Sequence, residues 1–167
     1  MECFQVIESG EGIEGRILRA LSRRGGMTER YAALEHPALL VVSPQAAAEG
    51  AELPGACRTI LLPGDAGRML EGLRAASAVS YGSSPRDSLT ISSREGDRLW
   101  AALQRELVTL GGQVVERQEF PLPLGPDGRA MSDLAVAGAL LLLGGIAGAA
   151  MPPRAPRKAR WIFHGGD

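Results

Sequence analysis

The sequence predicts an α/β fold, with a mostly parallel open sheet, flanking helices and a small antiparallel β meander. In the first half of the chain, short apolar runs of strand length alternate with helical segments, and parallel neighbours require such crossover connections. From Ser88 onward the pattern changes to alternation and glycine-containing turns, which is typical of antiparallel strands. A chain of 167 residues that is 45% apolar can bury one core. We therefore expect a single α/β domain over residues 1–146, followed by a Gly/Pro-rich basic tail over residues 147–167.

The first half is predicted to contain four strands joined by helices. Each strand is a short apolar run bounded by Gly, Pro or Ser, and the runs lie at residues 3–7, 38–43, 59–62 and 77–82. Helices are predicted at residues 13–21 and 66–76, where apolar residues recur at helical spacing, and at the more polar residues 27–35. Four strands with connections of this length favour a parallel sheet.

The second half is predicted to hold a three-stranded meander over about residues 88–122 and a helix over about residues 133–143. A helix over residues 98–108 is the alternative within the meander, because leucines recur there at a four-residue step; the Gly111-Gly112 hairpin signal favours strands. Ser132 and Asp133 offer N-cap chemistry for the last helix, and Gly144 is expected to end it.

An uncharged stretch over residues 134–151 has the length of a membrane span. Its strongly hydrophobic part ends near Leu143, and residues 144–151 are mainly Ala and Gly. This favours a buried helix over a membrane span.

Composition and charge exclude several classes of function. The net charge is −1, and the tail carries Arg154, Arg157, Lys158 and Arg160, so the body is acidic and offers no basic surface for nucleic acid. Lys158 is the only lysine, which excludes a phosphate-binding or Schiff-base lysine inside the fold. The two histidines and two cysteines do not have metal-ligand spacing, so we expect no metal and no cofactor. The N-terminus lacks the features of a secretory signal, and the expected location is the cytoplasm.

A glycine-rich motif follows the first predicted strand and opens the first predicted helix. It reads Gly10-Glu11-Gly12-Ile13-Glu14-Gly15, a literal G-x-G-x-x-G. In dinucleotide-binding proteins such glycines bring backbone amides close to a pyrophosphate. Here the acidic residues Glu8, Glu11 and Glu14 crowd the turn and would repel a phosphate. The motif is therefore also consistent with an acidic, glycine-rich turn that caps a helix.

The order of these pieces resembles the ATP-binding central domain of the Mur ligases. The resemblance runs over about residues 3–146 through FQVIESGEGIEGRILRAL, ALLVVSP, SAVSYGSSPRDSLTIS, EFPLPLG and SDLAVAGALLLLGG. In that family a P-loop strand begins the domain, and a helix preceded by a His-Asn pair closes it. This chain has Ile13 where the P-loop lysine stands and Glu14 where its hydroxyl residue stands, and it lacks the His-Asn pair. The resemblance thus implies a degenerate P-loop in a Rossmann-like fold that has lost ATP chemistry.

A second cluster, at residues 81–87, follows the fourth predicted strand. Ligands of open α/β sheets collect at the carboxyl edge, so this loop is expected to face the 10–15 turn across one crevice that also includes Asp65. The candidate ligand-binding residues are Gly10, Gly12, Gly15, Ser43 and Arg86. Arg86 is expected to be the only cation near the glutamates of the turn, and it either contacts a ligand or pairs with Asp87 or a nearby glutamate.

The function that these observations favour is a non-catalytic α/β protein with a binding or regulatory role and a protein or small-molecule partner. No catalytic residue is predicted. One alternative is a small-molecule or dinucleotide-binding enzyme that uses the carboxyl-edge crevice. The other is a membrane-associated accessory protein anchored by residues 134–163, where the tail supplies cations and the aromatic residues Trp161 and Phe163.

Overall fold

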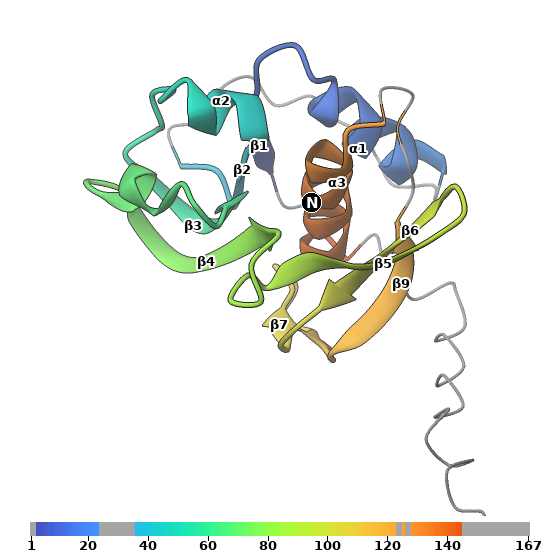
Figure 1. Cartoon of the computed structure of the whole chain (residues 1–167). Helices are drawn as coiled ribbons and strands as arrows, with labels where there is room; N and C mark the ends of the chain where they lie inside the picture. Colours follow the sequence, from blue (N-terminus) through green and yellow to red (C-terminus); the bar gives the residue numbers. More distant parts are fainter. Residues whose placement is uncertain (1–2, 24–35, 123–124, 126–127, 145–167) are drawn as a thin grey trace, which may run out of the picture.

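The computed structural model describes residues 3–23, 36–122, 125 and 128–144, and it confirms the α/β class (Figure 1). A seven-stranded sheet has the order β1-β2-β3-β4-β5-β6-β9, and β7 pairs with β8 in a separate hairpin. The strands are β1 (Phe4–Ile7), β2 (Leu39–Val42), β3 (Ala56–Pro63), β4 (Arg74–Gly82), β5 (Leu89–Glu95), β6 (Arg98–Leu103), β7 (Leu107–Val108), β8 (Val114–Val115) and β9 (Gln118–Leu122). The helices are α1 (Ile13–Arg23), α2 (Pro44–Ala48), the 3-10 helix η1 (Gly67–Leu70) and α3 (Ala130–Leu142).

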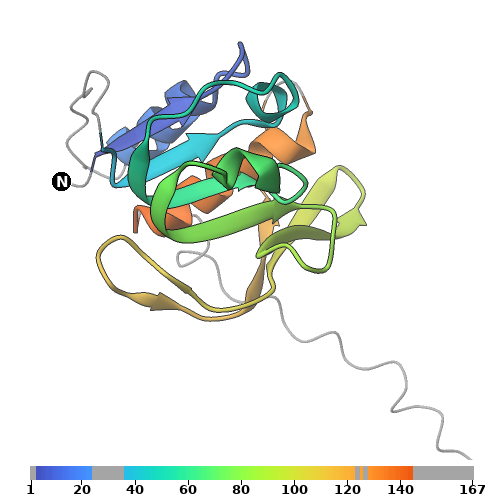
Figure 2. The same ribbon diagram turned by 90° about the vertical axis from the view of Figure 1, so that its left-hand side faces the viewer.

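The first four strands form the parallel half of the sheet, as predicted. Each of β1 to β4 pairs with the next in parallel register, so their carboxyl ends lie at one edge. Side chains alternate between two cores: Leu39 and Val41 pack with α1 and α3, whereas Leu40 and Val42 pack with α2 and the η1 segment. Figure 2 shows η1 in front of the strands and α3 behind them. Both faces of the parallel half are therefore covered.

The predicted meander is confirmed as β5, β6 and β9, which pair in antiparallel register. Residues 98–103 are a strand and not a helix, since Leu99, Ala101 and Leu103 alternate onto the buried face of a strand that is paired on both sides. The meander continues the parallel half, because β5 pairs with β4 at Tyr81–Leu89 and Gly82–Thr90. This continuity was not predicted from the sequence.

The helix predicted over residues 66–76 is wrong. A single 3-10 turn forms at Gly67–Leu70, and β4 begins at Arg74. Gly72 has a φ of +78°, a left-handed conformation that interrupts helical geometry. Beyond it, Arg74 and Ala75 pair with β3. Tertiary pairing therefore overrides the apolar periodicity in this segment.

The last helix is confirmed, but its predicted start and its predicted N-cap residues are wrong. It begins at Ala130 with Arg129 as its N-cap, so Ser132 and Asp133 lie in its first turn. Both side chains bond instead to segments outside the helix. Gly144, with a φ of +73°, follows the helix as expected. Within the part of the chain that the structure describes, no helix is long and apolar enough to cross a membrane.

The structure also contains a short helix that the sequence interpretation missed. Ser43 caps α2 by accepting a hydrogen bond from the Ala46 amide, and Pro44 occupies the first turn. A serine followed directly by proline is a recognised helix-start signal. The helix predicted over residues 27–35 and the tail over residues 147–167 lie outside the described residues.

Candidate functional site

The predicted ligand-binding residues lie at the carboxyl edge but line two different cavities. Gly10 and Gly12 line a cavity of about 200 Å³ between the turn after β1 and the start of α3. Arg86 lines a cavity of about 570 Å³ at the ends of β3 and β4. Ser43 is fully buried as the cap of α2, and Gly15 lies within α1. The single crevice expected from the sequence is thus divided.

The 10–15 turn folds around a carboxylate of the chain itself. Glu8 Oε1 accepts hydrogen bonds from the amides of Gly12 at 2.7 Å and Ile13 at 3.2 Å, and Glu8 Oε2 accepts one from Glu14 at 2.7 Å. Gly10 and Gly12 permit this path because both have left-handed φ values of +72° and +71°. Amides that converge at a helix N-terminus form an anion site, and here the anion is the Glu8 side chain.

A second glutamate of the turn is buried and joins three segments. Glu11 is 7% exposed. Its Oε2 accepts hydrogen bonds from the Gln45 amide at 3.4 Å and the Ser132 hydroxyl at 3.3 Å, and its Oε1 accepts one from the Ser9 amide at 3.3 Å. Ser132, predicted as a helix cap, therefore anchors α3 to the turn.

An ion pair between α1 and α3 lines the smaller cavity. Arg16 Nη1 lies 2.6 Å from Asp133 Oδ1, and that oxygen also accepts a hydrogen bond from the Gly125 amide at 2.9 Å. Arg16, Arg19 and Arg129 line this cavity together with Glu11. The expectation that Arg86 would be the only cation near the first turn is therefore wrong, because α1 and the start of α3 supply others.

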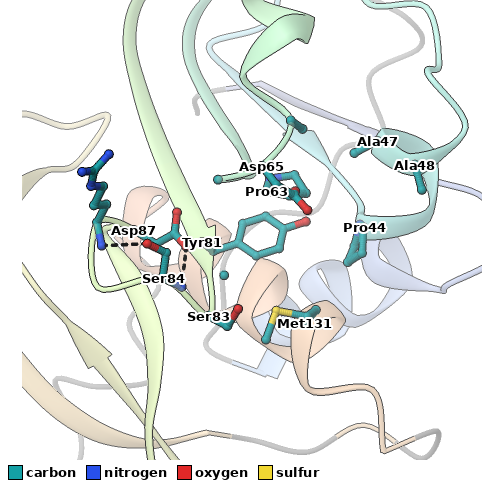
Figure 3. A pocket seen from close by; sticks show the side chains of 14 residues that line it. Pro44, Ala47, Ala48, Pro63, Asp65, Tyr81, Ser83, Ser84, Asp87 and Met131 are labelled. Carbon is teal, nitrogen blue, oxygen red and sulfur yellow. Dashed lines mark hydrogen bonds between the residues drawn. The ribbon is translucent and has the colours of Figure 1, made fainter.

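The larger cavity lies over Tyr81, at the carboxyl ends of β3 and β4 (Figure 3). Its lining residues are Pro44, Ala47, Ala48, Pro63, Gly64, Asp65, Ala66, Tyr81, Gly82, Ser83, Ser84, Arg86, Asp87 and Met131. Tyr81 is fully buried and donates a hydrogen bond to the Val42 carbonyl at 2.7 Å. Burial, Glu11 and Asp65 raise the pKa of Tyr81 far above its ordinary value, so the phenol stays protonated.

Comparisons with protein-family models, with curated proteins and with solved structures found no match. Function is therefore inferred from the geometry of the two cavities.

Asp87 shapes the 81–87 loop from within. It is 5% exposed, and its Oδ2 accepts a hydrogen bond from the Ser84 amide at 3.1 Å while its own amide bonds the Ser84 carbonyl at 3.0 Å. The carboxyl group is wedged between two glycines: a Cβ added at Gly64 would lie 1.7 Å from Asp87 Oδ1, and one added at Gly82 would lie 2.5 Å from Asp87 Oδ2. Side chains at either glycine are thus excluded by Asp87.

Arg86 extends from this loop into solvent. It is exposed and forms no ion pair with any residue that the structure describes, Asp87 included. Its backbone is held on both sides: the Arg86 amide donates to Ser84 Oγ at 3.2 Å, and its carbonyl accepts from Arg105 at 2.6 Å. The predicted Arg86–Asp87 pair is therefore absent, although the predicted turn at Asp87 is present.

The sequence indicates that a glutamate of the glycine-rich turn can cap the helix that follows. It does not indicate the contacts of Asp87. An acidic side chain just before a glycine-rich helix start is a signal for a carboxylate that caps the helix, and Glu8 fits it. The contact of Asp87 with Gly64 joins the ends of two strands, and no local pattern indicates it. Among the described residues, no group of three His, Cys, Asp or Glu side chains is arranged to hold a metal ion.

Proposed function

We propose that this chain is a non-catalytic binding protein that resembles a Mur ligase central domain with its ATP chemistry lost. The supporting observation is the position of Glu8, whose carboxylate accepts hydrogen bonds from Gly12, Ile13 and Glu14. In a functional P-loop, such amides cradle phosphate oxygens. Here an incoming phosphate would have to displace a negative charge that is covalently part of the turn.

The side chains of the turn also oppose nucleotide binding. Ile13 and Glu14 provide neither the cation that contacts β- and γ-phosphates nor the hydroxyl that holds magnesium. The same occupied amides disfavour the dinucleotide-binding alternative, because a pyrophosphate needs them as well. A binding role is better served by the larger cavity, whose volume of about 570 Å³ falls within the usual range for small-molecule sites.

Isothermal titration calorimetry with ATP and magnesium tests this proposal. We expect no binding tighter than about 1 mM in the wild type. Micromolar binding would overturn the proposal, since Glu8 and a phosphate cannot share the same amides. Thermal-shift measurements with NAD and NADP extend the test to the dinucleotide alternative, because a ligand of the folded state raises the melting temperature.

Engineered variants separate the charge of Glu8 from the missing P-loop residues. Because the Ile13 side chain is fully buried in the core, the variants leave it unchanged. The Glu14→Thr variant restores the hydroxyl but retains Glu8, and we expect no gain in ATP affinity from it. Adding Glu8→Ser frees the amides, and we expect this double variant to bind ATP at least about tenfold more tightly than Glu14→Thr alone. Equal affinities of the two variants would argue against the role assigned to Glu8.

A further inference from the structure

Two acidic residues, the buried Asp87 and the exposed Asp65, line the larger cavity. Asp65 and Asp87 line it from the ends of β3 and β4, and Figure 3 shows both labelled residues on the side of the cavity where Tyr81 lies. Burial, Glu11 and Asp65 raise the pKa of Tyr81, so both carboxylates lie close enough to act on the phenol. Arg86 is the only cationic residue among the described residues that line the cavity, and it is exposed at the rim.

One carboxylate oxygen of Asp87 can accept a further hydrogen bond. Asp87 Oδ2 accepts the Ser84 amide, whereas Asp87 Oδ1 accepts no hydrogen bond from the described part of the chain. Asp87 is only 5% exposed, and it still lines the cavity. Asp87 Oδ1 is not among the fully buried atoms that lack a hydrogen-bond partner, so it remains accessible to a ligand. A ligand that brings a charged donor to this oxygen can form a charge-assisted hydrogen bond with it.

The walls of the cavity indicate what kind of cation would fit. Pro44, Pro63 and Met131 give it an apolar side, and a bare metal ion gains nothing from such contacts. The described residues also provide no third carboxylate, histidine or cysteine for a metal. An organic cation can satisfy both surfaces, with its charge on the acids and its carbon body on the apolar side.

We infer that this cavity binds a small primary amine in its protonated form. The ammonium group donates to the carboxylates of Asp87 and Asp65, and the alkyl part lies against Pro44, Pro63 and Met131. Ammonium–carboxylate hydrogen bonds in a partly buried site are stronger than neutral ones, which accounts for a preference for amines over alcohols of the same shape. This inference rests on the proposed binding role and identifies the ligand class for it.

The test compares three four-carbon probes that differ only in the head group: n-butylamine, n-butanol and butyrate. Amide NMR shifts of the full chain, followed during titration at pH 7, locate each probe and give its Kd. We expect n-butylamine to shift the amides of Gly64, Ser84 and Asp87, with a Kd at least about tenfold lower than that of n-butanol. Equal or weaker binding of the amine would overturn the inference.

Matched variants assign the effect to the two acids. Asp87→Asn keeps an oxygen that can accept a hydrogen bond from the Ser84 amide but removes the charge. Asp65→Asn changes an exposed side chain, so we expect the fold to stay intact. Each is expected to weaken n-butylamine binding by about tenfold, whereas the control Asp97→Asn, in the exposed turn between β5 and β6, should leave it unchanged. If Asp65→Asn and Asp97→Asn bind the amine equally well, Asp65 does not hold it and the inference fails. This holds even if Asp87→Asn does not fold.

Further measurements identify the source of the amine and separate failure of this inference from failure of the proposed function. Nα-acetyl-lysine methylamide presents the same ammonium as a protein side chain, so tighter binding than n-butylamine indicates a lysine of a partner protein, and weaker binding indicates a free amine. If magnesium chloride displaces n-butylamine, as measured by the same amide shifts, the cavity binds a metal ion instead of an amine. That result would overturn the inference. Binding of butanol or butyrate alone would refute the amine and retain the binding role, whereas micromolar ATP binding would refute the proposed function.

Discussion

The 10–15 turn and the 81–87 loop both follow parallel strands at the same edge of the sheet, and they use acidic side chains differently. Glu8 uses both carboxylate oxygens to accept three backbone amides of the turn. Asp87 receives one amide, from Ser84, and presses against the backbone of Gly64 and Gly82. The first carboxylate closes an anion site, whereas the second remains at the floor of an open cavity.

The difference follows from side-chain length and local backbone. Glu8 precedes a helix whose first amides have no intrahelical partners, and its longer side chain reaches them. Asp87 ends a loop that leads into β5, where no helix begins, so few free amides are within reach of its shorter side chain. A fold of this type can therefore contain a nucleotide-like loop without a nucleotide site, and a ligand cavity elsewhere on the same edge.

The largest expected effect comes from breaking the packing around Asp87. Gly64→Ala places a Cβ 1.7 Å from Asp87 Oδ1, so either the carboxylate or the β3 end must move. We expect a loss of about 3 kcal/mol in the free energy of unfolding, measured by urea denaturation. Gly67→Ala is the matched control, because a Cβ there meets nothing within 4 Å. If the two variants are equally stable, the 81–87 loop is not built around Asp87.

The parallel half was predictable because its strands carry their own signals, whereas the cavity at its edge was not. Residues 39–42 form an uninterrupted buried run, and the pleat sends alternate side chains to the two cores without reference to other segments. The helix predicted over residues 66–76 is wrong because the leucines there have helical spacing, whereas Arg74 and Ala75 pair with β3 and form a strand.

The position of the candidate site at the sheet edge could be predicted because the ends of the strands could be predicted. Topology alone placed the 10–15 turn and the 81–87 loop at the same edge. The division into two cavities depends on contacts between distant segments, such as that of Glu11 with Ser132 and that of Arg16 with Asp133. Such pairs have no local sequence pattern, and they place Arg16 and α3 at the cavity that Glu11 also lines.

An intermediate effect is expected when the first carboxylate is removed. Glu8→Ala leaves the amides of Gly12, Ile13 and Glu14 without their acceptor, at positions where water reaches some of them. We expect a loss of about 1–2 kcal/mol, comparable with removal of a helix cap, in chemical denaturation at pH 7. Glu14→Ala is the control, since its exposed carboxylate lies in the same first turn and accepts none of these bonds. A larger loss in Glu14→Ala would mean that the helix dipole, and not the hydrogen bonds, makes Glu8 important.

The smallest expected effect concerns Arg86, the predicted site residue with the least structural involvement. Its side chain is exposed and forms no ion pair within the described ranges, and the hydrogen bonds at this position use its backbone. Arg86→Ala should therefore change the free energy of unfolding by no more than about 0.5 kcal/mol. Arg105→Ala serves as the comparison, because it removes the donor to the Arg86 carbonyl and should loosen the loop more.

Amine titrations of Arg86→Ala then sharpen the contrast between the two loops. A guanidinium at the rim repels an incoming ammonium, so its removal should tighten n-butylamine binding slightly. Weaker amine binding in Arg86→Ala would instead mean that Arg86 holds the cavity in shape, and a loss of stability larger than that of Arg105→Ala would give the side chain a structural role that its exposed position does not indicate.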